Sequence, residues 1–381
     1  MKGRHYTQSD VLTLGKRVNN SKRSYLLINP LQAKHIPVSP TSALEMMRHL
    51  GRLVQKSNTG RSLVIGFAET ATAIATAVSL ELSPACRYIQ TTREKLEEVH
   101  DWILFSEEHS HATEQKLCGD CLGEWITEAD HIIIVDDEFS TGKTLINIAR
   151  ALKAYAPEAE KKDFVAASIV NRVNAEHLRM LTNEGYRFVY LVKPEEEDYE
   201  KMVLDYQVRE AEKVPFTGED SNPAITIQLQ APYLNPRTGV SSQKYGEGCA
   251  LLSEEACRRV LPMLTGSRIL ILGTEECMYP ALTVGKRLEE LCGERAVRCH
   301  ATTRSPIGIS ELEDYPVQNG CSLCSFYDPN RATYLYNLQE YDMAVVVTDA
   351  GKDIRRKGLR DLQEALHRYG CERIICLGIG E

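Results

Sequence analysis

The chain has 381 residues, more than one domain usually contains, so two domains are expected. Apolar residues make up 43% and charged residues 26%, as in ordinary globular proteins, and the net charge of −8 gives no overall sign of nucleic-acid binding. Residues 1–6 are basic, but no apolar signal region follows and no apolar run reaches membrane-spanning length. We therefore predict a cytoplasmic protein with neither a membrane nor a nucleic acid as partner.

Strands and helices alternate through the first half of the chain. Residues 42–45 form a capping box that opens a helix through about Leu50. The apolar patterns further predict a helix at 71–82 and strands at 61–66, 88–93, 132–135, 164–170 and 188–192. This alternation is typical of an α/β fold, in which helices cover both faces of a parallel sheet.

The most informative stretch is residues 131–144, His-Ile-Ile-Ile-Val-Asp-Asp-Glu-Phe-Ser-Thr-Gly-Lys-Thr. Its apolar run predicts a strand buried on both faces, and a helical pattern follows, so residues 140–144 are expected in the turn between them. Amides at a helix start attract phosphate, while Asp136 and Asp137 can accept hydrogen bonds from vicinal hydroxyls or hold them through Mg²⁺. The stretch predicts a sugar-phosphate site.

Other interpretations of this stretch are available. The nucleoside-triphosphate P-loop also ends in Gly-Lys-Thr, but it needs a glycine five residues before Gly142, where Asp137 stands, so it is excluded. An ordinary buried strand followed by a helix cap is the structural alternative. Glu138 is either a third acid near the sugar or a solvated residue.

A segment rich in Pro, Gly, Ser and Asn, residues 214–248, predicts a domain boundary. Beyond it the earlier pattern returns about 210 residues later: a strand ending in Gly273 resembles the one ending in Gly66, and Glu276 follows as Glu69 does. Residues 302–304 repeat the Thr-Thr-Arg of 91–93, and 344–349 repeat 132–137. Two α/β units can converge on such a pattern, but the near-constant spacing favours duplication.

The second copy differs where chemistry is expected. Residues 348–353, Thr-Asp-Ala-Gly-Lys-Asp, have lost one acid of the pair and the Ser-Thr-Gly-Lys-Thr turn, so they predict a poor sugar-phosphate site. Thr303, Arg304 and Ser305, together with residues 273–276, are instead a candidate anion site for a phosphorylated product or a regulator. A purely structural role is the alternative.

The stretch at 132–144 resembles the phosphoribosyl pyrophosphate loop of type I phosphoribosyltransferases, which has four apolar residues, two acids, two variable positions and a Thr-Gly-x-Thr-like turn. The two-part chain resembles a family known from bacterial tellurite-resistance gene clusters, in which a phosphoribosyltransferase domain precedes a domain named for a Thr-Arg-Ser-Pro motif, here residues 303–306. The resemblance also covers residues 29–30, 34–37, 66–69, 91–93 and 107–113.

This resemblance implies two Rossmann-like parallel-sheet domains. The first, residues 1–213, has the type I phosphoribosyltransferase fold; residues 214–248 are a linker or hood; and the second, residues 249–381, is a degenerate repeat. The implied activity is pentosyl transfer: phosphoribose moves from phosphoribosyl pyrophosphate to a base-like acceptor, pyrophosphate is released, and Mg²⁺ is the cofactor. A non-catalytic sensor of phosphoribosyl pyrophosphate or a nucleotide is the alternative, and phosphorolysis of a nucleotide is a third. Such enzymes often dimerise, so a homodimer is compatible with the resemblance.

The resemblance also assigns site residues. Asp136 and Asp137 would bind the ribose hydroxyls and Mg²⁺, and the 5′-phosphate would be bound by Ser140, Thr141, Gly142, Lys143 and Thr144. The turn containing Glu69 and Thr70 is the expected pyrophosphate site, with an ordinary capped turn as the alternative.

Other assignments lie outside this loop and turn. Arg93 would bind phosphate oxygens or be a surface charge. Glu108, His109 and His111 fall where type I enzymes carry a mobile loop; they would move or orient a proton, form a metal pair, or be solvated. By family analogy, Lys34 belongs to a hood over the base.

Twelve cysteines, in a chain for which no signal peptide is predicted, indicate reduced thiols. Two Cys-x-x-Cys pairs, Cys118 with Cys121 and Cys321 with Cys324, would offer four thiolates to a structural zinc. The pairs are about 200 residues apart, beyond the spacing of a local zinc ribbon, so unpaired structural thiols are the favoured interpretation.

Overall fold

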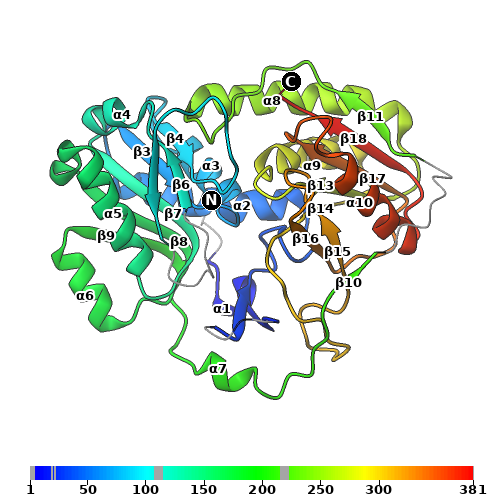
Figure 1. The fold of residues 1–381 in the computed structure, drawn as a ribbon, viewed down its shortest axis with the longest axis horizontal. Coiled ribbons are helices and arrows are strands. Elements are labelled where there is room, and N and C mark those ends of the chain that lie inside the picture. The colour runs from blue at the N-terminus through cyan, green and yellow to red at the C-terminus, as the bar shows by residue number, and fades with distance from the viewer. Residues whose placement is uncertain (1–4, 19, 21–22, 107–114, 215–222, 381) are drawn as a thin grey trace. The chain divides into compact units, whose positions relative to one another are not determined.

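A computed structural model describes residues 5–18, 20, 23–106, 115–214 and 223–380. The chain divides into two compact units (Figure 1). The first unit comprises Met1–Gln8, Glu45–Glu196 and Leu234–Glu247, and the second comprises Ser9–Leu44, Glu197–Tyr233 and Gly248–Glu381. Three helices contribute residues to both units: α1 (Gln8–Val11), α2 (Pro40–Ser57) and α8 (Ser242–Val260).

The first unit is built on a sheet of strand order β12-β4-β3-β7-β8-β9, parallel except for the short β12 at its edge. Helices follow most of the parallel strands, and a two-stranded antiparallel ribbon, β5 with β6, stands apart from the sheet. The elements are β3 (Ser62–Gly66), α3 (Thr72–Leu80), β4 (Arg87–Gln90), β5 (Trp102–Phe105), β6 (Gln115–Cys118), α4 (Leu122–Glu128), β7 (His131–Phe139), α5 (Lys143–Tyr155), the 3₁₀ turn Pro157–Lys161, β8 (Asp163–Asn171), α6 (Ala175–Asn183), β9 (Tyr186–Val192) and β12 (Val240–Ser241).

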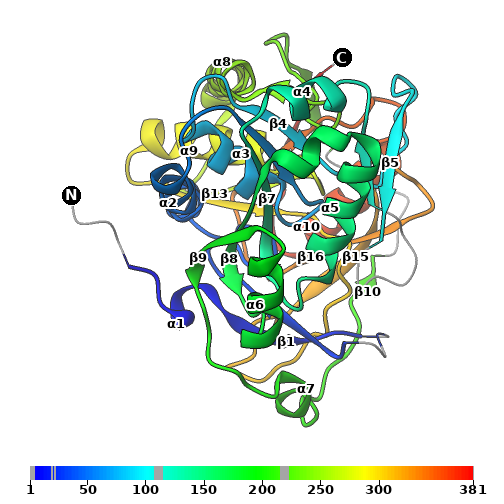
Figure 2. The same ribbon diagram turned by 90° about the vertical axis from the view of Figure 1, so that its left-hand side faces the viewer.

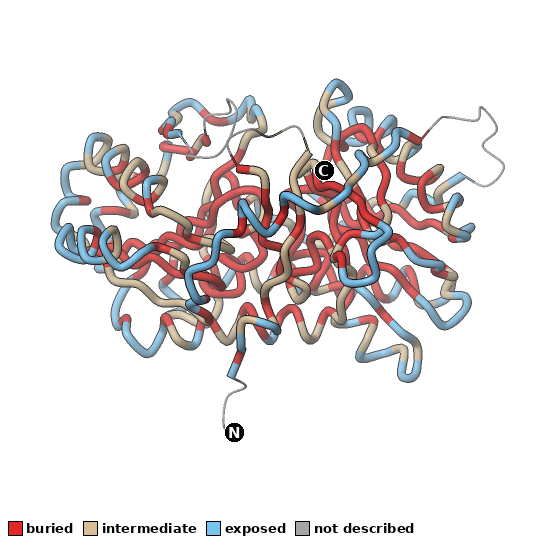
Figure 3. Tube along the Cα trace, turned by 90° about the horizontal axis from the view of Figure 1, so that it is seen from below, coloured by how far each residue is buried: buried red, intermediate tan, exposed pale blue. Residues whose placement is uncertain are grey.

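Alternation along the strands explains how this sheet is covered. Every second strand residue packs into one apolar cluster with α4 and α5, and Figure 2 shows α5 and α6 in front of the strands. α3 is buried along its length except for Leu80, which fits a helix made mainly of small and apolar residues. The inner strands β3 and β8 are buried over nearly their whole length, whereas the edge strand β9 is buried only at its two ends; Figure 3 colours the buried residues of the chain red. The apolar face predicted for the helix after the motif is confirmed: its buried residues are Leu145, Ile148, Ala149 and Leu152.

The second unit contains a five-stranded parallel sheet of order β11-β18-β17-β13-β14 and a smaller sheet, β10-β15-β16. Among the described residues, no helix of either unit is long and apolar enough to cross a membrane. The elements are α1 (Gln8–Val11), β1 (Thr13–Lys16), β2 (Tyr25–Ile28), α7 (Tyr199–Met202), β10 (Glu212–Lys213), β11 (Ile225–Gln228), most of α8, the 3₁₀ turn Leu261–Met263, β13 (Arg268–Gly273), α9 (Tyr279–Cys292), β14 (Ala296–Ala301), β15 (Gly320–Cys324), β16 (Ala332–Tyr336), β17 (Met343–Thr348), α10 (Arg356–Arg368) and β18 (Ile374–Gly378).

These units divide the chain differently from the boundaries expected from sequence. Residues 9–44 and 197–213 belong to the second unit, because Leu26 and Ile28 of β2 pack against Ile307 and Ile309 and Arg209 pairs with Ile309. The expected linker, residues 214–248, supplies an edge strand to each large sheet: β11 to the second and β12 to the first. Apolar burial thus joins segments that are far apart in the sequence.

The two large sheets share a strand order. The four main strands of each sheet can be numbered 1 to 4 in chain order. On that numbering β3, β4, β7 and β8 lie side by side in the order 2-1-3-4, and so do β13, β14, β17 and β18. The fifth place is taken by β9 in one unit and by the earlier segment β11 in the other. The two-sheet α/β fold predicted from the sequence is therefore present, and its origin by duplication stays a prediction.

Backbone hydrogen bonds match as well. The glycine that ends the first strand accepts from the amide of a threonine, and the hydroxyl of that threonine accepts from the amide two residues after the glycine. The bonds are Thr91 N to Gly66 O at 2.9 Å and Ala68 N to Thr91 Oγ1 at 2.8 Å, against Thr302 N to Gly273 O at 3.1 Å and Glu275 N to Thr302 Oγ1 at 3.0 Å. Ala68 and Glu275 thus occupy the same place in their units.

Close approach of α3 to β3 requires Gly66. A Cβ at this position would lie 2.4 Å from Cβ of Ala75 on α3. We predict that Gly66→Ala lowers the free energy of unfolding by about 1–3 kcal/mol because the packed interface must shift. Adding Ala75→Gly, which alone should cost about 1 kcal/mol, would restore space. Urea titrations of the single and double variants should show a smaller loss than the sum; strict additivity would contradict the proposed clash.

Candidate active site

The acid pair lies within β7 rather than beyond its end. The expected strand stopped at Val135, whereas β7 continues to Phe139 because β8 pairs with it as far as the Phe139–Asn171 position. Asp136 and Asp137 are half-buried there, and the buried side chain of Phe139 closes the strand. The pair is therefore held by sheet hydrogen bonds rather than by a loop.

Asp137 is tied to the turn that follows β3. The Thr70 hydroxyl donates to Oδ1 of Asp137 at 3.0 Å, and the amide of Asp137 donates to Oδ1 of Asp136 at 2.9 Å. Burial raises the pKa of Asp137, and the neighbouring Glu138 carboxylate acts in the same direction, against the hydrogen bonds from Asp136 and Thr70. The strand order reverses between β3 and β7, and ligands of open α/β sheets bind at the carboxyl ends of strands at such a point.

Glu138, the third acid, forms an ion pair with Arg172. Its Oε1 lies 2.7 Å from an Nη of Arg172, and both side chains are largely buried. Arg172 follows directly after β8, and its amide donates to the carbonyl of Phe139. Sequence reasoning did not single out Arg172, although its place at the end of the strand next to β7 was the available signal. The charge of Glu138 is therefore compensated by an arginine from the neighbouring strand end.

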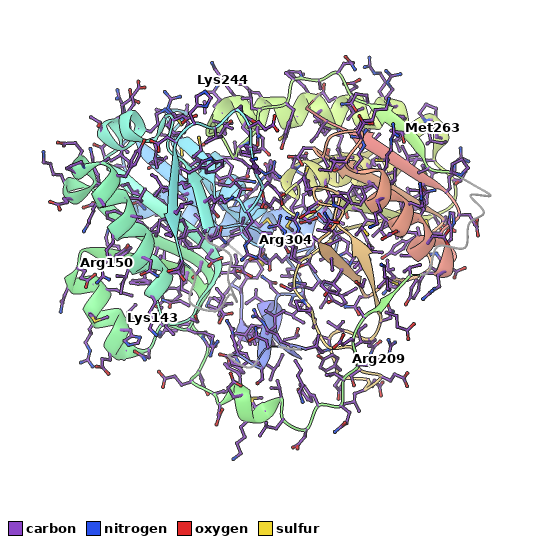
Figure 4. The ribbon with its side chains drawn as sticks, in the orientation of Figure 1. Lys143, Arg150, Arg209, Lys244, Met263 and Arg304 are labelled. Carbon is purple, nitrogen blue, oxygen red and sulfur yellow. The ribbon has the colours of Figure 1, made fainter. Side chains whose placement is uncertain are left out.

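The turn from β7 into α5 depends on Gly142. This residue precedes the first residue of α5 with φ of 84°, in the left-handed region that favours glycine, and a Cβ there would lie 2.5 Å from Cδ1 of Leu181. The Lys143 amide donates to the Thr141 hydroxyl at 3.3 Å. Lys143 is exposed at the start of α5 (Figure 4), while Ser140, Thr141 and Thr144 are half-buried. The predicted strand-to-helix turn is thus present.

The turn after β3 is fixed by side chains from two other segments. The Thr91 hydroxyl accepts from the amide of Ala68 at 2.8 Å, and the side chain of Gln115 donates to the carbonyl of Ala68 at 3.0 Å. The Ala68–Glu69 peptide bond is cis, and Glu69 is 9% exposed. Gln115, fully buried at the start of β6, was not identified from the sequence. Through Thr70 this turn meets Asp137, so the structure brings together the candidate pyrophosphate and ribose residues.

Other predicted residues of the first unit lie further along. Arg93 is half-buried shortly after β4, and Thr92 beside it pairs with Lys116 of β6. Glu108, His109 and His111 lie outside the described residues, between β5 and β6 in the chain. Their assignments, like those of the other site residues, stay predictions.

Lys34 belongs to the second unit and is fully buried. Its ammonium group donates to the carbonyls of Glu275 and Thr302, each at 2.9 Å. These carbonyls follow β13 and β14, so Lys34 stabilises the turns at the carboxyl edge of the second sheet. This contact lies within its own unit, and the assignment of Lys34 to a hood over the base stays a prediction.

The candidate anion site of the second unit is occupied by the protein's own carboxylates. Arg304, labelled in Figure 4, places Nε 2.6 Å from Glu275 and an Nη 3.2 Å from Glu276, and Arg331 lies 2.9 Å from Glu275. Neither glutamate side chain is exposed. Thr303 is buried, and its hydroxyl accepts from the Ser305 amide at 3.2 Å. Because Glu275 stands where the first unit has Ala68, the charge of Arg304 is compensated internally, which disfavours a free anion.

The cysteine pairs are thiols in both units. Cys118 and Cys121 belong to the first unit, where burial raises the pKa of Cys118 and raises that of Cys121 to about 11. Cys321 and Cys324 are three residues apart on β15 and so point to opposite faces of their sheet, which prevents them from binding one ion together. No group of three or more metal-binding side chains is found in the part of the chain that the structure describes.

Comparison with known proteins gives two family matches. Residues 11–190 match a family described as phosphoribosyl transferase, and residues 235–366 match the TRSP domain described as C-terminal to it. The sequence matches none of the curated proteins searched.

Several solved structures are similar to this chain at low sequence identity. The APRTase of Giardia lamblia, complexed with 9-deazaadenine, has 13% identity and a TM-score of 0.37, with 49% of this chain and 94% of that chain covered. The adenine phosphoribosyltransferase of Rhodothermus marinus has 11% identity and a TM-score of 0.32, covering 49% and 96%. That of Trypanosoma brucei, in complex with AMP, pyrophosphate and ribose-5-phosphate, has 11% identity and a TM-score of 0.33, covering 48% and 76%.

Burial of Asp137 predicts a dependence of stability on pH. Its pKa in the folded chain is raised above the ordinary value of 3.8, so the folded state keeps the proton to higher pH and loses stability as pH rises from 3.8 through the raised pKa. We therefore expect Asp137→Asn, in metal-free buffer, to have a higher free energy of unfolding than the wild type at neutral pH. The gap should close as pH falls toward 3.8.

Urea unfolding at several pH values measures this difference. Asp136→Asn is the matched control, because its side-chain oxygen can still accept from the amide of residue 137. A constant difference between Asp137→Asn and wild type across the pH range would show that the Asp137 proton is not linked to folding.

Proposed function

The chain belongs to the phosphoribosyl transferase family with a C-terminal TRSP domain, which makes it a type I phosphoribosyltransferase, and from this premise we propose the reaction and its site. The first unit transfers phosphoribose from phosphoribosyl pyrophosphate to a base-like acceptor and releases pyrophosphate, with Mg²⁺. The observation that carries the proposal is the Thr70–Asp137 hydrogen bond, because it joins the turn after β3 to the acid pair of β7 at the reversal of strand order.

In this reaction the bond between C1 of ribose and the pyrophosphate oxygen breaks while positive charge builds on the ribose ring. Positioning and electrostatic stabilisation supply most of the catalysis. Asp136 and Asp137 accept hydrogen bonds from the vicinal hydroxyls of ribose and face the positive charge that develops on the ring. Burial disfavours the ionised form of Asp137 because the carboxylate loses stabilising water. A hydroxyl donor or a cation bound to this carboxylate stabilises its negative charge in place of that water.

The phosphates of the donor bind at two turns. Residues 140–144 offer hydroxyls, the Lys143 cation and amides at the start of α5, which suits the 5′-phosphate. The turn containing Glu69 and Thr70 offers backbone amides to the pyrophosphate, and Arg93 follows the next strand of the sheet. In the sheet β3 lies between β4 and β7, so one strand separates Arg93 from the acid pair along the sheet edge.

Magnesium fits this donor set. Asp136 and Asp137 present hard carboxylate oxygens, the ligands that Mg²⁺ prefers, while the charge of the adjacent Glu138 is compensated by Arg172. When bound, Mg²⁺ would offset the negative charge of the leaving pyrophosphate.

Release of pyrophosphate tests the proposed transfer. Protein, Mg²⁺ and phosphoribosyl pyrophosphate are mixed with a panel of bases, and pyrophosphate is followed over time. We expect release that depends on one of the bases and that falls at least about 100-fold in Asp136→Asn/Asp137→Asn, since loss of one stabilising group in a transition state often costs that much. Glu158→Gln is the control, because Glu158 is an exposed carboxylate in the 3₁₀ turn that follows α5.

Two outcomes would contradict transfer by the acid pair. Base-dependent release that persists at the wild-type rate in the double variant would remove Asp136 and Asp137 from the mechanism. Tight binding of phosphoribosyl pyrophosphate without release, for every base tested, would favour the alternative of a non-catalytic sensor.

The conformation of the phosphate turn gives a second test. Gly142 and Gly185 both have positive φ, 84° and 93°, but a Cβ at 142 would meet Leu181 while a Cβ at 185 would have nothing within 4 Å. Backbone strain destabilises both alanine variants by about 1 kcal/mol, but only Gly142→Ala must also displace the turn. We expect Gly142→Ala to weaken ribose 5-phosphate binding at least ten-fold, by calorimetry, and Gly185→Ala to leave it within two-fold. Equal losses of affinity in the two variants would show that the conformation of this turn does not matter for phosphate binding.

A further inference from the structure

The loop between β17 and α10 in the second unit contains a buried arginine. Arg355, which directly precedes α10, is 2% exposed. Its Nη1 donates to the carbonyl of Ala350 at 2.9 Å, and its Nη2 has no hydrogen-bond partner among the described residues. No carboxylate of the described chain forms an ion pair with it. Arg304 in the same unit has two carboxylate partners of this kind, which Arg355 lacks.

A buried guanidinium without an anion is costly, because it has lost the water that stabilised its charge. One carbonyl is a weak replacement for that water. The geometry of this group therefore calls for an anion that the chain itself does not supply.

A second polar group without a partner lies beside Arg355. Gln228 on β11 pairs in register with Gly378 on β18, and both polar atoms of its side-chain amide are buried without a hydrogen-bond partner in the described structure. A Cβ at residue 378 would lie 2.3 Å from Oε1 of Gln228 and 2.7 and 2.8 Å from the two Nη atoms of Arg355. Glycine thus leaves room for the guanidinium and the amide to converge over the carboxyl ends of β11 and β18.

The position of this pair in the fold is also informative. In the first unit the turn from β7 ends at Gly142, the residue before α5; in the second unit the loop from β17 ends at Arg355, the residue before α10. α10 has 13 residues, and the amides at its start add to the positive potential of the arginine. Arginine's planar fork suits the oxygens of a phosphate.

From these contacts we propose that the second unit binds the phosphate group of a small phosphorylated molecule, with Arg355 and Gln228 as its ligands. The site is separate from residues 303–305, where the glutamates already neutralise Arg304. It also stands independently of transfer in the first unit, because none of its residues belongs to that unit.

Equilibrium dialysis with radiolabelled inorganic phosphate, on the full chain at constant ionic strength, counts the binding sites. We expect Arg355→Met and Gln228→Leu each to lose one equivalent of phosphate relative to wild type, or to bind it at least ten-fold more weakly. Arg356→Met is the matched control, since Arg356 is exposed and paired with Asp353, and it should keep the wild-type number. A phosphate bound in the first unit adds the same equivalent to every variant and does not affect the comparison.

Thermal unfolding separates a ligand role from a structural one. In phosphate-free buffer Arg355→Met should unfold at or above the wild-type temperature, because an apolar side chain replaces an unpaired buried charge. Phosphate should then raise the unfolding temperature of wild type more than that of the variant. Should Arg355→Met fail to fold, Arg355→Lys, which keeps the charge without the planar fork, is expected to fold and to bind phosphate at least ten-fold more weakly.

Three results would overturn the proposal. Wild type and both Arg355 variants binding the same number of equivalents with equal affinity would exclude the site. A lower unfolding temperature for Arg355→Met in phosphate-free buffer, with no difference in the response to phosphate, would make Arg355 a structural residue. Acetate displacing phosphate with equal affinity would assign the site to carboxylates instead.

Discussion

The parallel pairing of β3 with β7 is the constraint on which the candidate active site depends. It places Gly66 beside Val135, and the Phe67 amide donates to the Val135 carbonyl at 3.0 Å. The turn after β3 and the acids of β7 therefore begin at the same level of the sheet, and one hydroxyl, that of Thr70, can span them. Two segments whose joined residues, Thr70 and Asp137, are 67 positions apart in the chain become neighbours because the backbone register brings them together.

The same backbone frame carries opposite electrostatics in the two units. In the first, the position that follows the glycine turn is Ala68, and the acids lie one strand away on β7. In the second, the equivalent position is Glu275, whose buried carboxylate forms ion pairs with Arg304 and Arg331. The two units thus differ at one fixed backbone position: the first has an alanine there, and the second has a glutamate that compensates two arginines. Arg355, which has no carboxylate partner among the described residues, lies at another strand end.

Much of this fold could be predicted from the sequence because the signals are local. The apolar run at 132–135, the helical spacing after Lys143 and the glycine of the phosphate turn each reflect chemistry within a few residues. The extension of β7 to Phe139 could not be predicted, because it comes from pairing with β8. The ion pair of Glu138 with Arg172 and the burial of Lys34 likewise depend on partners distant in the chain.

Each unit is built from segments that are far apart in the chain, and this affects how the protein folds during synthesis. Segments 9–44 and 197–233 are made before residues 248–381, yet they complete the second unit: β11 forms the edge of its sheet and Lys34 bonds to carbonyls beyond residue 270. During translation β2 cannot pack against Ile307 and Ile309, and β11 cannot pair with β18, until those later residues have been synthesised. Non-local pairing of this kind slows folding and exposes apolar surface on the way, so the amino-terminal segment is where a nascent chain of this protein is most in need of protection.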